Sequence, residues 1–276
     1  MSYQLLCTDV DGTLLNSHGK ISPGNRAAIQ AAVAAGKKIV LASGRSWRSL
    51  TFYEQELGLD VPGQYGIGFN GGAVYEILDS GGVKLHHALL MPNAIALEIF
   101  ATLAPVVANY NEMHMLAYNN EGYLIAEAAL RATRLFDEMK RLGAKTVPSY
   151  QTQTCDMYKI LIHGTHEDLL EIADFSAARF PGQCQTMFSA RHLLELTPMG
   201  VGKGSGIAFL AELLRIPIAQ VIAMGDEAND ITMLQTAGLG IAVANAVPAA
   251  VTAANLHLPA SNNEDAVSAV INQYLI

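Results

Sequence analysis

The chain has 276 residues, of which 51% are hydrophobic and 15% are charged, and its formal net charge is −8. So much apolar surface excludes an intrinsically disordered chain, because its burial can offset the entropy lost on ordering. The excess of 25 acidic over 17 basic residues excludes a general electrostatic footprint for nucleic acid or for an anionic membrane surface.

The cysteines and the amino-terminal segment indicate a soluble, cytoplasmic protein. Cys7, Cys155 and Cys184 are widely spaced, which predicts neither a disulfide framework nor a thiolate zinc site. The first residues have no basic region and reach Asp9 early, unlike a secretory signal. Polar residues interrupt the uncharged stretch 231–263, so no apolar run of ~20 residues is left to span a membrane.

Short apolar runs alternate with helical segments at the amino-terminal end. The run 3–8 predicts a strand, and the alanine-rich segment 26–36 predicts a helix that ends at Gly36. A wholly apolar strand is expected at 38–42, followed by a second helix that ends near Gly58.

The middle of the chain has a different pattern. Segment 72–85 is typical of a hairpin that turns at 79–82. The next segments predict helices at 92–103 and 130–142 and strands at 113–118, 157–163 and 193–196. We interpret residues 86–189 as an inserted α+β domain, and residues 1–85 and 190–276 as one discontinuous core.

The carboxyl-terminal part returns to the first pattern. Helices are expected at 206–215 and 231–237, and buried strands at 220–224 and 240–243. Strands that are apolar on both faces and alternate with helices predict a parallel sheet covered on both sides. The predicted fold class is therefore α/β, a doubly wound, Rossmann-like core with an α+β insertion.

Polar side chains stand where three of these strands end. Asp9 and Asp11 follow the first strand, Ser43 follows the second, and Asp226 follows the strand at 220–224. Ligands of open parallel sheets bind beyond the carboxyl ends of the strands, so these side chains converge on one crevice if the strands are neighbours. Lys203 precedes the Asp226 strand and can point to the same place.

The chemistry of this set suits phosphoryl transfer. Asp9, Asp226 and Asp230 offer hard oxygen ligands, which suit Mg²⁺ better than zinc and need a cation to relieve their repulsion. Asp9 and Asp11 can both face the crevice, one as nucleophile and one as acid/base.

Groups that can hold the phosphate oxygens stand beside these acids. Ser43 and neighbouring backbone N–H groups can bind those oxygens. The ammonium of Lys203 can stabilise the charge that develops on them.

These motifs resemble those of a known superfamily. The segments Asp9–Thr13, Ser43–Arg45, Lys203–Gly204 and Gly225–Asp230 stand in the order and context of the haloacid dehalogenase superfamily. The long insertion resembles the cap domain of its Cof-like sugar-phosphate phosphatases. The resemblance implies an Mg²⁺-dependent phosphatase that acts on a small phosphorylated metabolite as a monomer or weak homodimer.

The resemblance also implies a role for each matched residue. Asp9 would attack phosphorus to form an aspartyl-phosphate, and Asp11 would protonate the leaving group and then deprotonate the attacking water. The implied magnesium ligands are Asp9, the main-chain carbonyl of Asp11, and Asp226. Asp230 would be either a further ligand or a residue that contacts the ligands. The implied phosphate-binding residues are Val10, Ser43, Gly44, Lys203 and Asn229. The Asn70–Gly72 turn resembles a family feature, but no catalytic role is predicted for it.

Other interpretations compete with this one. A phosphomutase on sugar phosphates would use the same paired aspartates, and a non-catalytic sugar-phosphate-binding protein would share the scaffold. Segment 66–71 matches the G-x-G-x-x-G pattern of dinucleotide-binding proteins, but a strand rather than a helix is expected after it, so we reject that hypothesis.

Overall fold

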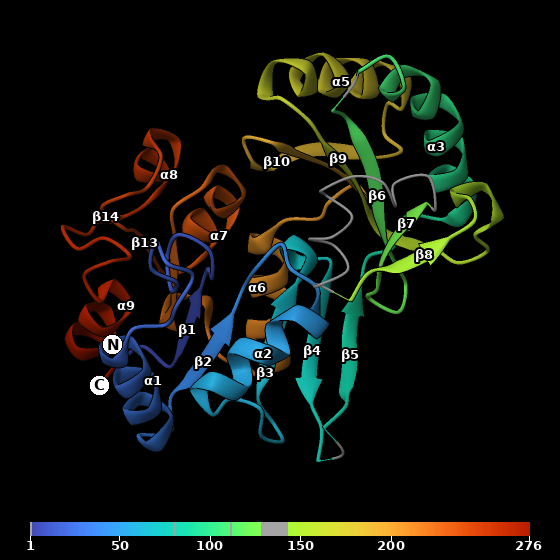
Figure 1. The fold of residues 1–276 in the computed structure, drawn as a ribbon. Coiled ribbons are helices and arrows are strands. Elements are labelled where there is room, and N and C mark those ends of the chain that lie inside the picture. The colour runs from blue at the N-terminus through green and yellow to red at the C-terminus, as the bar shows by residue number, and fades with distance from the viewer. Residues whose placement is uncertain (1, 80, 111, 128–142) are drawn as a thin grey trace. The chain divides into compact units, whose positions relative to one another are not determined.

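The computed structural model describes residues 2–79, 81–110, 112–127 and 143–276. Contacts within the chain divide it into two compact units (Figure 1). The first unit joins Met1–Ala88 to Val201–Ile276, and the second unit is Leu89–Gly200.

A parallel sheet forms the centre of the first unit. Its five strands lie in the order β14-β13-β12-β1-β2. They are β1 (Leu5–Thr8), β2 (Lys38–Leu41), β12 (Val221–Gly225), β13 (Leu239–Ala242) and β14 (Leu256–His257). All residues of β1 and β12 are buried, as expected for a parallel sheet with both faces covered. The predicted α/β class is thereby confirmed.

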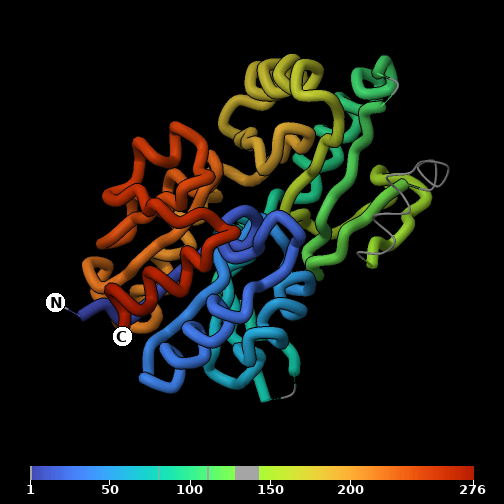
Figure 2. Tube along the Cα trace, turned by 60° about the vertical axis from the view of Figure 1, so that its left-hand side comes forward, coloured from blue at the N-terminus to red at the C-terminus, as the bar shows by residue number. Residues whose placement is uncertain are grey.

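The first unit also contains helices, several of which contact this sheet. They are α1 (Pro23–Ala34), α2 (Trp47–Leu57), α6 (Lys203–Leu213), α7 (Ile231–Thr236), α8 (Pro248–Ala253) and α9 (Ala266–Val270). Leu5 and Val221 of the sheet share one apolar cluster with Ile207 of α6 and Met233 of α7. Outside that cluster, α1 contacts β2 and lies beside α9, as Figures 1 and 2 both show.

Local sequence signals explain where the first two helices begin. The first helix starts at Pro23, earlier than predicted, because the Ser22 hydroxyl accepts a hydrogen bond from the Asn25 N–H and proline suits the first helical turn. Ser46 caps α2 in the same way, and Gly58 ends it in the left-handed conformation.

A small antiparallel sheet extends the first unit. Its strands are β3 (Tyr65–Gly68), β4 (Ala73–Ile77) and β5 (Val83–Ala88), in that order. A single parallel bridge between Ala42 and Ile67 connects it to the end of β2. The predicted hairpin is confirmed, and a strand follows the G-x-G-x-x-G segment, so it does not open a dinucleotide-binding helix.

In its described residues, the second unit is a sheet against which long helices pack. Its six strands lie in the order β10-β11-β9-β6-β7-β8. They are β6 (His114–Asn119), β7 (Leu124–Glu127), β8 (Lys145–Val147), β9 (Met157–His163), β10 (Gln185–Ala190) and β11 (Leu193–Thr197). Side chains of α3 (Asn93–Val107) and α5 (His166–Arg179) share one apolar core with side chains of the sheet. Figure 1 shows both helices beside this sheet. The helix predicted at 130–142 lies outside the described residues.

The boundaries between the two units differ from the predicted ones. A boundary at 86 would cut β5, which pairs with β4 over its whole length. A boundary at 189 would cut β10 and separate it from β11, although these strands pair with each other and β11 also pairs with β9. Residues 86–88 therefore belong to the first unit and residues 190–200 to the second.

Among the helices that the described residues form, none combines the length and the hydropathy needed to cross a membrane.

Candidate active site

Three strand ends bring the candidate residues together in the first unit. β1 lies between β12 and β2 in the sheet, and all three run in the same direction. Asp9 directly follows β1, Asp226 directly follows β12, and Ser43 follows β2 after one residue. Neighbouring parallel strands end at one edge, so the sheet gathers these side chains at the place where such folds bind ligands.

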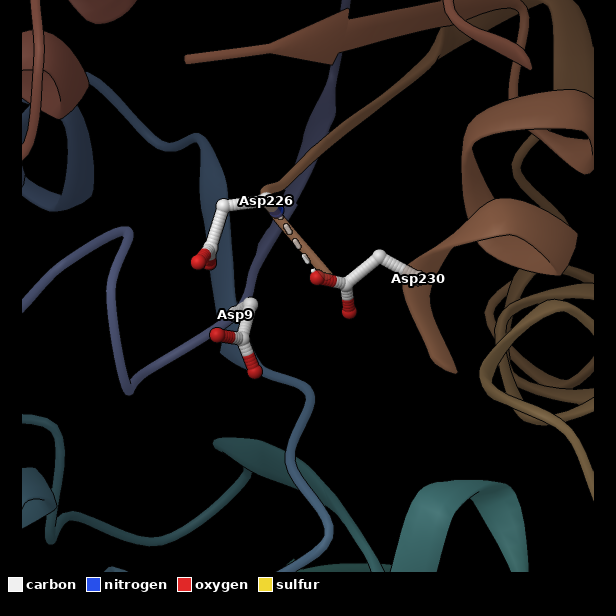
Figure 3. Close-up of side chains that lie close together, drawn as sticks. All are labelled: Asp9, Asp226 and Asp230. Atoms are coloured by element: carbon white, nitrogen blue, oxygen red, sulfur yellow. Dashed lines mark hydrogen bonds between the residues drawn. The ribbon is translucent and has the colours of Figure 1, made fainter. Parts of the chain in front are cut away.

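Three buried carboxylates lie together at this edge. Asp9, Asp226 and Asp230 each place a carboxylate oxygen within 4.8 Å of the others (Figure 3). Asp230 comes from the short turn Ala228–Asp230, which folds back toward the strand. Burial, with the neighbouring acids, raises the pKa of Asp9 well above its ordinary value. Burial and Asp230 likewise raise the pKa of Asp226 to about 7, although a hydrogen bond from Thr13 opposes the shift.

Lys203 is buried among these acids. Its Nζ donates to Asp9 Oδ1 at 2.5 Å and to Asp230 Oδ1 at 2.5 Å. Burial alone would lower the pKa of Lys203, but the charges of Asp230 and Asp9 reverse that effect and raise it above its ordinary value. The lysine therefore remains an ammonium although its side chain is only 1% exposed.

Both carboxylate oxygens of Asp230 accept hydrogen bonds. Oδ1 accepts from Lys203, and Oδ2 accepts from the backbone N–H of Glu227 at 3.0 Å. Oδ2 also accepts from the backbone N–H of Asp226 at 2.8 Å, the bond that Figure 3 draws. These bonds fix the backbone that carries Asp226 and fix the lysine head. Asp230 thus orients its neighbours, and a cation would reach Asp9 and Asp226 more readily.

The turn after Asp9 packs directly on Asp226. Gly12 has φ +83°, and a Cβ at this position would stand 2.3 Å from Asp226 Oδ2, so only glycine fits. The Thr13 hydroxyl donates to Asp226 Oδ1 at 2.7 Å, and Asn245 Nδ2 donates to the Gly12 carbonyl at 2.8 Å. The two strand ends are therefore locked together.

The donor set fits a hard divalent cation. Carboxylate oxygens suit Mg²⁺, and three buried carboxylates stand against one buried ammonium. Asp9 and Asp226 each use one oxygen in the contacts above, which leaves the other oxygen of each for a metal. Electrostatic balance and ligand chemistry both favour a cation between Asp9 and Asp226.

A strained turn links the remaining candidate residues. Phe69 and Asn70 have φ of 52° and 55°, which is uncommon outside glycine. The Asn70 N–H donates to the carbonyl of Ser43 at 2.9 Å, and its Oδ1 accepts from Asn229 Nδ2 at 3.0 Å. A Cβ on Gly44 would lie 3.1 Å from Asn70 Oδ1. Asn70 thus connects Ser43, Gly44 and Asn229.

The sequence predicts the Asn70–Gly72 turn but no catalytic role for it. Its signal was the Asn-Gly pair between two strands, which by itself is typical of many turns. The link to Ser43 and Asn229 depends on tertiary packing. Val10, another candidate, is fully buried and its carbonyl accepts from the N–H groups of Leu14 and Leu15.

The side chain of Asp11 does not join the acidic cluster. It is 56% exposed and forms an ion pair with Arg45. Arg45 Nε and Nη2 donate to Asp11 Oδ2 and Oδ1, both at 2.7 Å. From the sequence, Asp9 and Asp11 are expected to face one crevice together. The structure places Asp9 in the acidic cluster, whereas the Asp11 side chain pairs with Arg45, for which the sequence predicts no role.

Comparison with known proteins agrees with this fold. A family model described as haloacid dehalogenase-like hydrolase matches residues 6–271. The chain therefore belongs to the haloacid dehalogenase-like hydrolases, and it is an enzyme of the phosphatase class within them.

Two curated relatives are named phosphatases. The chain is 30% identical over 256 residues to the HMP-PP phosphatase of Serratia proteamaculans, covering 89% of this chain and 85% of that one. It is 28% identical over 283 residues to the 5-amino-6-(5-phospho-D-ribitylamino)uracil phosphatase YitU of Bacillus subtilis, covering 98% and 97%.

Solved structures show the same architecture. A haloacid dehalogenase-like hydrolase from Bacteroides thetaiotaomicron matches with a TM-score of 0.84 at 27% identity, covering 99% of both chains. A protein from Thermotoga maritima matches with a TM-score of 0.80 at 27% identity, covering 98% of this chain and 97% of that one.

Proposed function

We propose that this enzyme is an Mg²⁺-dependent phosphatase that hydrolyses small phosphomonoesters through an aspartyl-phosphate intermediate. The observation that carries the proposal is the buried cluster in which one lysine contacts Asp9 and Asp230 beside Asp226. A nucleophile, a fixed positive charge and a cation site then lie within one water-poor place, as phosphoryl transfer requires.

The reaction divides into two halves. First, an oxygen of Asp9 forms a bond to phosphorus, the bond from phosphorus to the leaving oxygen breaks, and that oxygen takes a proton from the Asp11 carboxyl group. Second, a water oxygen bonds to phosphorus, its proton goes to Asp11, and the bond to Asp9 breaks. The products are the alcohol and inorganic phosphate, and both aspartates return to their starting forms.

The other residues hold and orient the phosphoryl group. Lys203 supplies a permanent positive charge close to the Asp9 oxygen that attacks. Ser43, Gly44, Asn229 and the backbone of Val10 would bind the remaining oxygens, with Asn70 fixing the first three in place. Asp9, Asp226 and the main-chain carbonyl of Asp11 would hold Mg²⁺, and Asp230 would brace them. Bound there, the ion would offset the negative charge of phosphate and carboxylates.

The substrate class follows from the relatives. The two named phosphatases act on phosphorylated small metabolites by their names, and we propose a sugar phosphate or similar metabolite for this chain. We also propose that residues 89–200 serve as the cap domain that selects the leaving group, and that the enzyme works in the cytoplasm as a monomer or weak homodimer.

Hydrolysis assays test the reaction. Wild-type enzyme should release inorganic phosphate from 4-nitrophenyl phosphate with Mg²⁺, without a sugar bisphosphate activator, which a phosphomutase would need. Asp9→Asn should abolish turnover, while Asp174→Asn, at an exposed site on α5, should leave it unchanged. Full activity of Asp9→Asn would contradict the mechanism.

Thermal unfolding tests the metal site separately. A ligand at 100 times its Kd stabilises the fold by about 2.7 kcal/mol, so Mg²⁺ should raise the Tm of the wild type. Asp226→Asn should lose that increase and Asp174→Asn should keep it. An equal increase in all three proteins would place the ion elsewhere.

A further inference from the structure

Arg45 stands at the strand ends without a role in the reaction proposed above. It follows Ser43 by two residues, on the connection from β2 to α2. Its guanidinium binds both carboxylate oxygens of Asp11, through Nε and Nη2, each at 2.7 Å. Such a planar two-point contact fixes the orientation of a carboxylate, which a single ammonium cannot do.

The Arg45 backbone is itself held in place. Its N–H donates to the Ser43 hydroxyl at 3.2 Å, and its carbonyl accepts from the Phe69 N–H at 2.9 Å. The guanidinium carbon lies 5.4 Å from the centre of the Tyr53 ring, which is a cation–π distance. The arginine is therefore anchored by β2, by the strained Phe69–Asn70 turn and by α2.

Asp11 needs such an anchor. Its backbone is fixed, because the next two residues contact Asn245 and Asp226. Its side chain, however, is 56% exposed and stands outside the buried acidic cluster. An exposed aspartate samples several rotamers, whereas proton transfer requires a carboxyl group held within hydrogen-bond reach of the reacting oxygen.

We propose that Arg45 is a positioning residue for Asp11, which sets the direction of the carboxyl group that exchanges the proton. The inference rests on the proposed phosphatase function. Arg45 gives up no proton in either half of the reaction, since the proton moves between Asp11 and the leaving oxygen and then between water and Asp11. The contribution of Arg45 is geometric, and it acts through Asp11.

The dependence of the rate on the leaving group distinguishes a positioning role of Arg45 from a purely structural role. A nitrophenolate leaves with little help from an acid, whereas a phenolate or an alkoxide depends on the proton from Asp11. A misdirected Asp11 should therefore slow the poor leaving group more. Lysine at position 45 keeps the charge but cannot contact both oxygens in a plane, and methionine removes the charge while keeping an unbranched side chain.

The experiment compares kcat and KM on 4-nitrophenyl phosphate and phenyl phosphate. Since a placed acid contributes about 10²–10⁴ in rate, we expect Arg45→Lys to lower kcat on phenyl phosphate by about tenfold and Arg45→Met by about 100-fold. Losses on the nitrophenyl ester should stay within about threefold, and KM within about twofold. Arg26→Lys is the matched control, since Arg26 pairs with Glu56 between α1 and α2 and should leave both rates unchanged.

A double-mutant cycle completes the test. If Arg45 acts through Asp11, adding Arg45→Met to Asp11→Asn should lower the rate by less than about twofold further. If the rate losses of the two single variants multiply in the double variant, or if Arg45→Met slows both esters equally, the proposal is overturned in favour of a structural role. A raised KM with unchanged kcat would overturn it in favour of direct substrate contact.

Two measurements keep the outcomes distinct. Circular dichroism and Tm show whether each variant is folded, and Arg45→Lys carries the test if Arg45→Met does not fold. A wild-type enzyme that hydrolyses neither ester would overturn the phosphatase function itself, and that result differs from wild-type turnover with the wrong dependence on the leaving group.

Discussion

Each of the two units buries a lysine against acidic side chains, but the charge balance differs. In the second unit Lys159 Nζ donates to Glu195 Oε1 at 2.6 Å across the sheet, and both side chains are almost fully buried. In the first unit Lys203 meets Asp9 and Asp230, with Asp226 beside them. Among the described residues, Lys159 and Glu195 pair one cation with one anion, which is a structural arrangement. One cation among three carboxylates instead leaves negative charge that a bound metal can neutralise.

Between the two buried lysines, the larger expected effect on activity comes from removing Lys203. Lys203→Met should lower kcat by about 10²–10³, as loss of one fixed electrostatic group does in other enzymes. Lys159→Met should change kcat on 4-nitrophenyl phosphate by less than about threefold, since it disturbs a structural pair. Steady-state kinetics at a temperature where both variants are folded measures the difference, and equal losses would remove the distinction between the two clusters.

The pair of Lys159 and Glu195 should affect the free energy of unfolding rather than kcat. Lys159→Met leaves Glu195 buried without its cation, which should lower the free energy of unfolding by about 3–5 kcal/mol. The double change Lys159→Met with Glu195→Leu should recover most of that loss, because no buried charge remains. Urea unfolding followed by circular dichroism measures both, and a double variant as unstable as the single one would contradict the interpretation.

Glu54 is another buried acid, and no lysine or arginine of the described residues forms an ion pair with it. It extends the comparison to the effect of pH. Glu54 on α2 is 1% exposed and accepts from the Tyr75 hydroxyl at 2.6 Å. Burial raises the pKa of Glu54 to about 7. The folded state therefore binds this proton more tightly than the unfolded chain does.

The sign of the pH effect follows from that difference in pKa. The stability associated with neutral Glu54 should be fully present below pH 4.5, the ordinary value, and should be lost as pH rises through about 7. The expected loss is about 3 kcal/mol, because each unit of pKa difference corresponds to about 1.4 kcal/mol. Glu54→Gln should remove this component when the free energy of unfolding is measured from pH 4 to 8, and an unchanged pH profile would disprove it.

The smallest expected effect on activity comes from Asn70, whose uncharged side chain contacts Asn229. Asn70→Gly keeps the left-handed backbone but removes the amide that contacts Asn229. We expect kcat to fall by about tenfold, the equivalent of about 1.4 kcal/mol for a hydrogen bond of ordinary strength. Asn70→Ala should fall further, because alanine also strains the turn. Equal rates for wild type and Asn70→Gly would show that the backbone alone fixes Ser43 and Gly44.

The sequence predicted those parts of the site that lie directly on strand ends. Asp9, Ser43 and Asp226 follow apolar runs, and the order of neighbouring parallel strands places them together. Arg45 and Asn70 escaped prediction because their partners, Asp11 and Asn229, are distant in sequence. The carboxyl-terminal boundary of the second unit also differs from the prediction. This boundary depends on the pairing of β11 with β9, which the composition of β11 does not reveal.

The pairing of β1 with β12 has a consequence for biosynthesis. Thr13 and Asp226, which hydrogen-bond across that pair, are 213 positions apart in the chain. A ribosome therefore delivers Asp9, the proposed nucleophile, early and its neighbours Lys203 and Asp226 only after the whole second unit has emerged. Because the proposed site needs all three residues and contacts so distant in sequence form slowly, we expect the nascent chain to stay inactive until synthesis is nearly complete. A chain truncated before β12 would also expose one edge of β1, which makes it a target for aggregation and proteolysis.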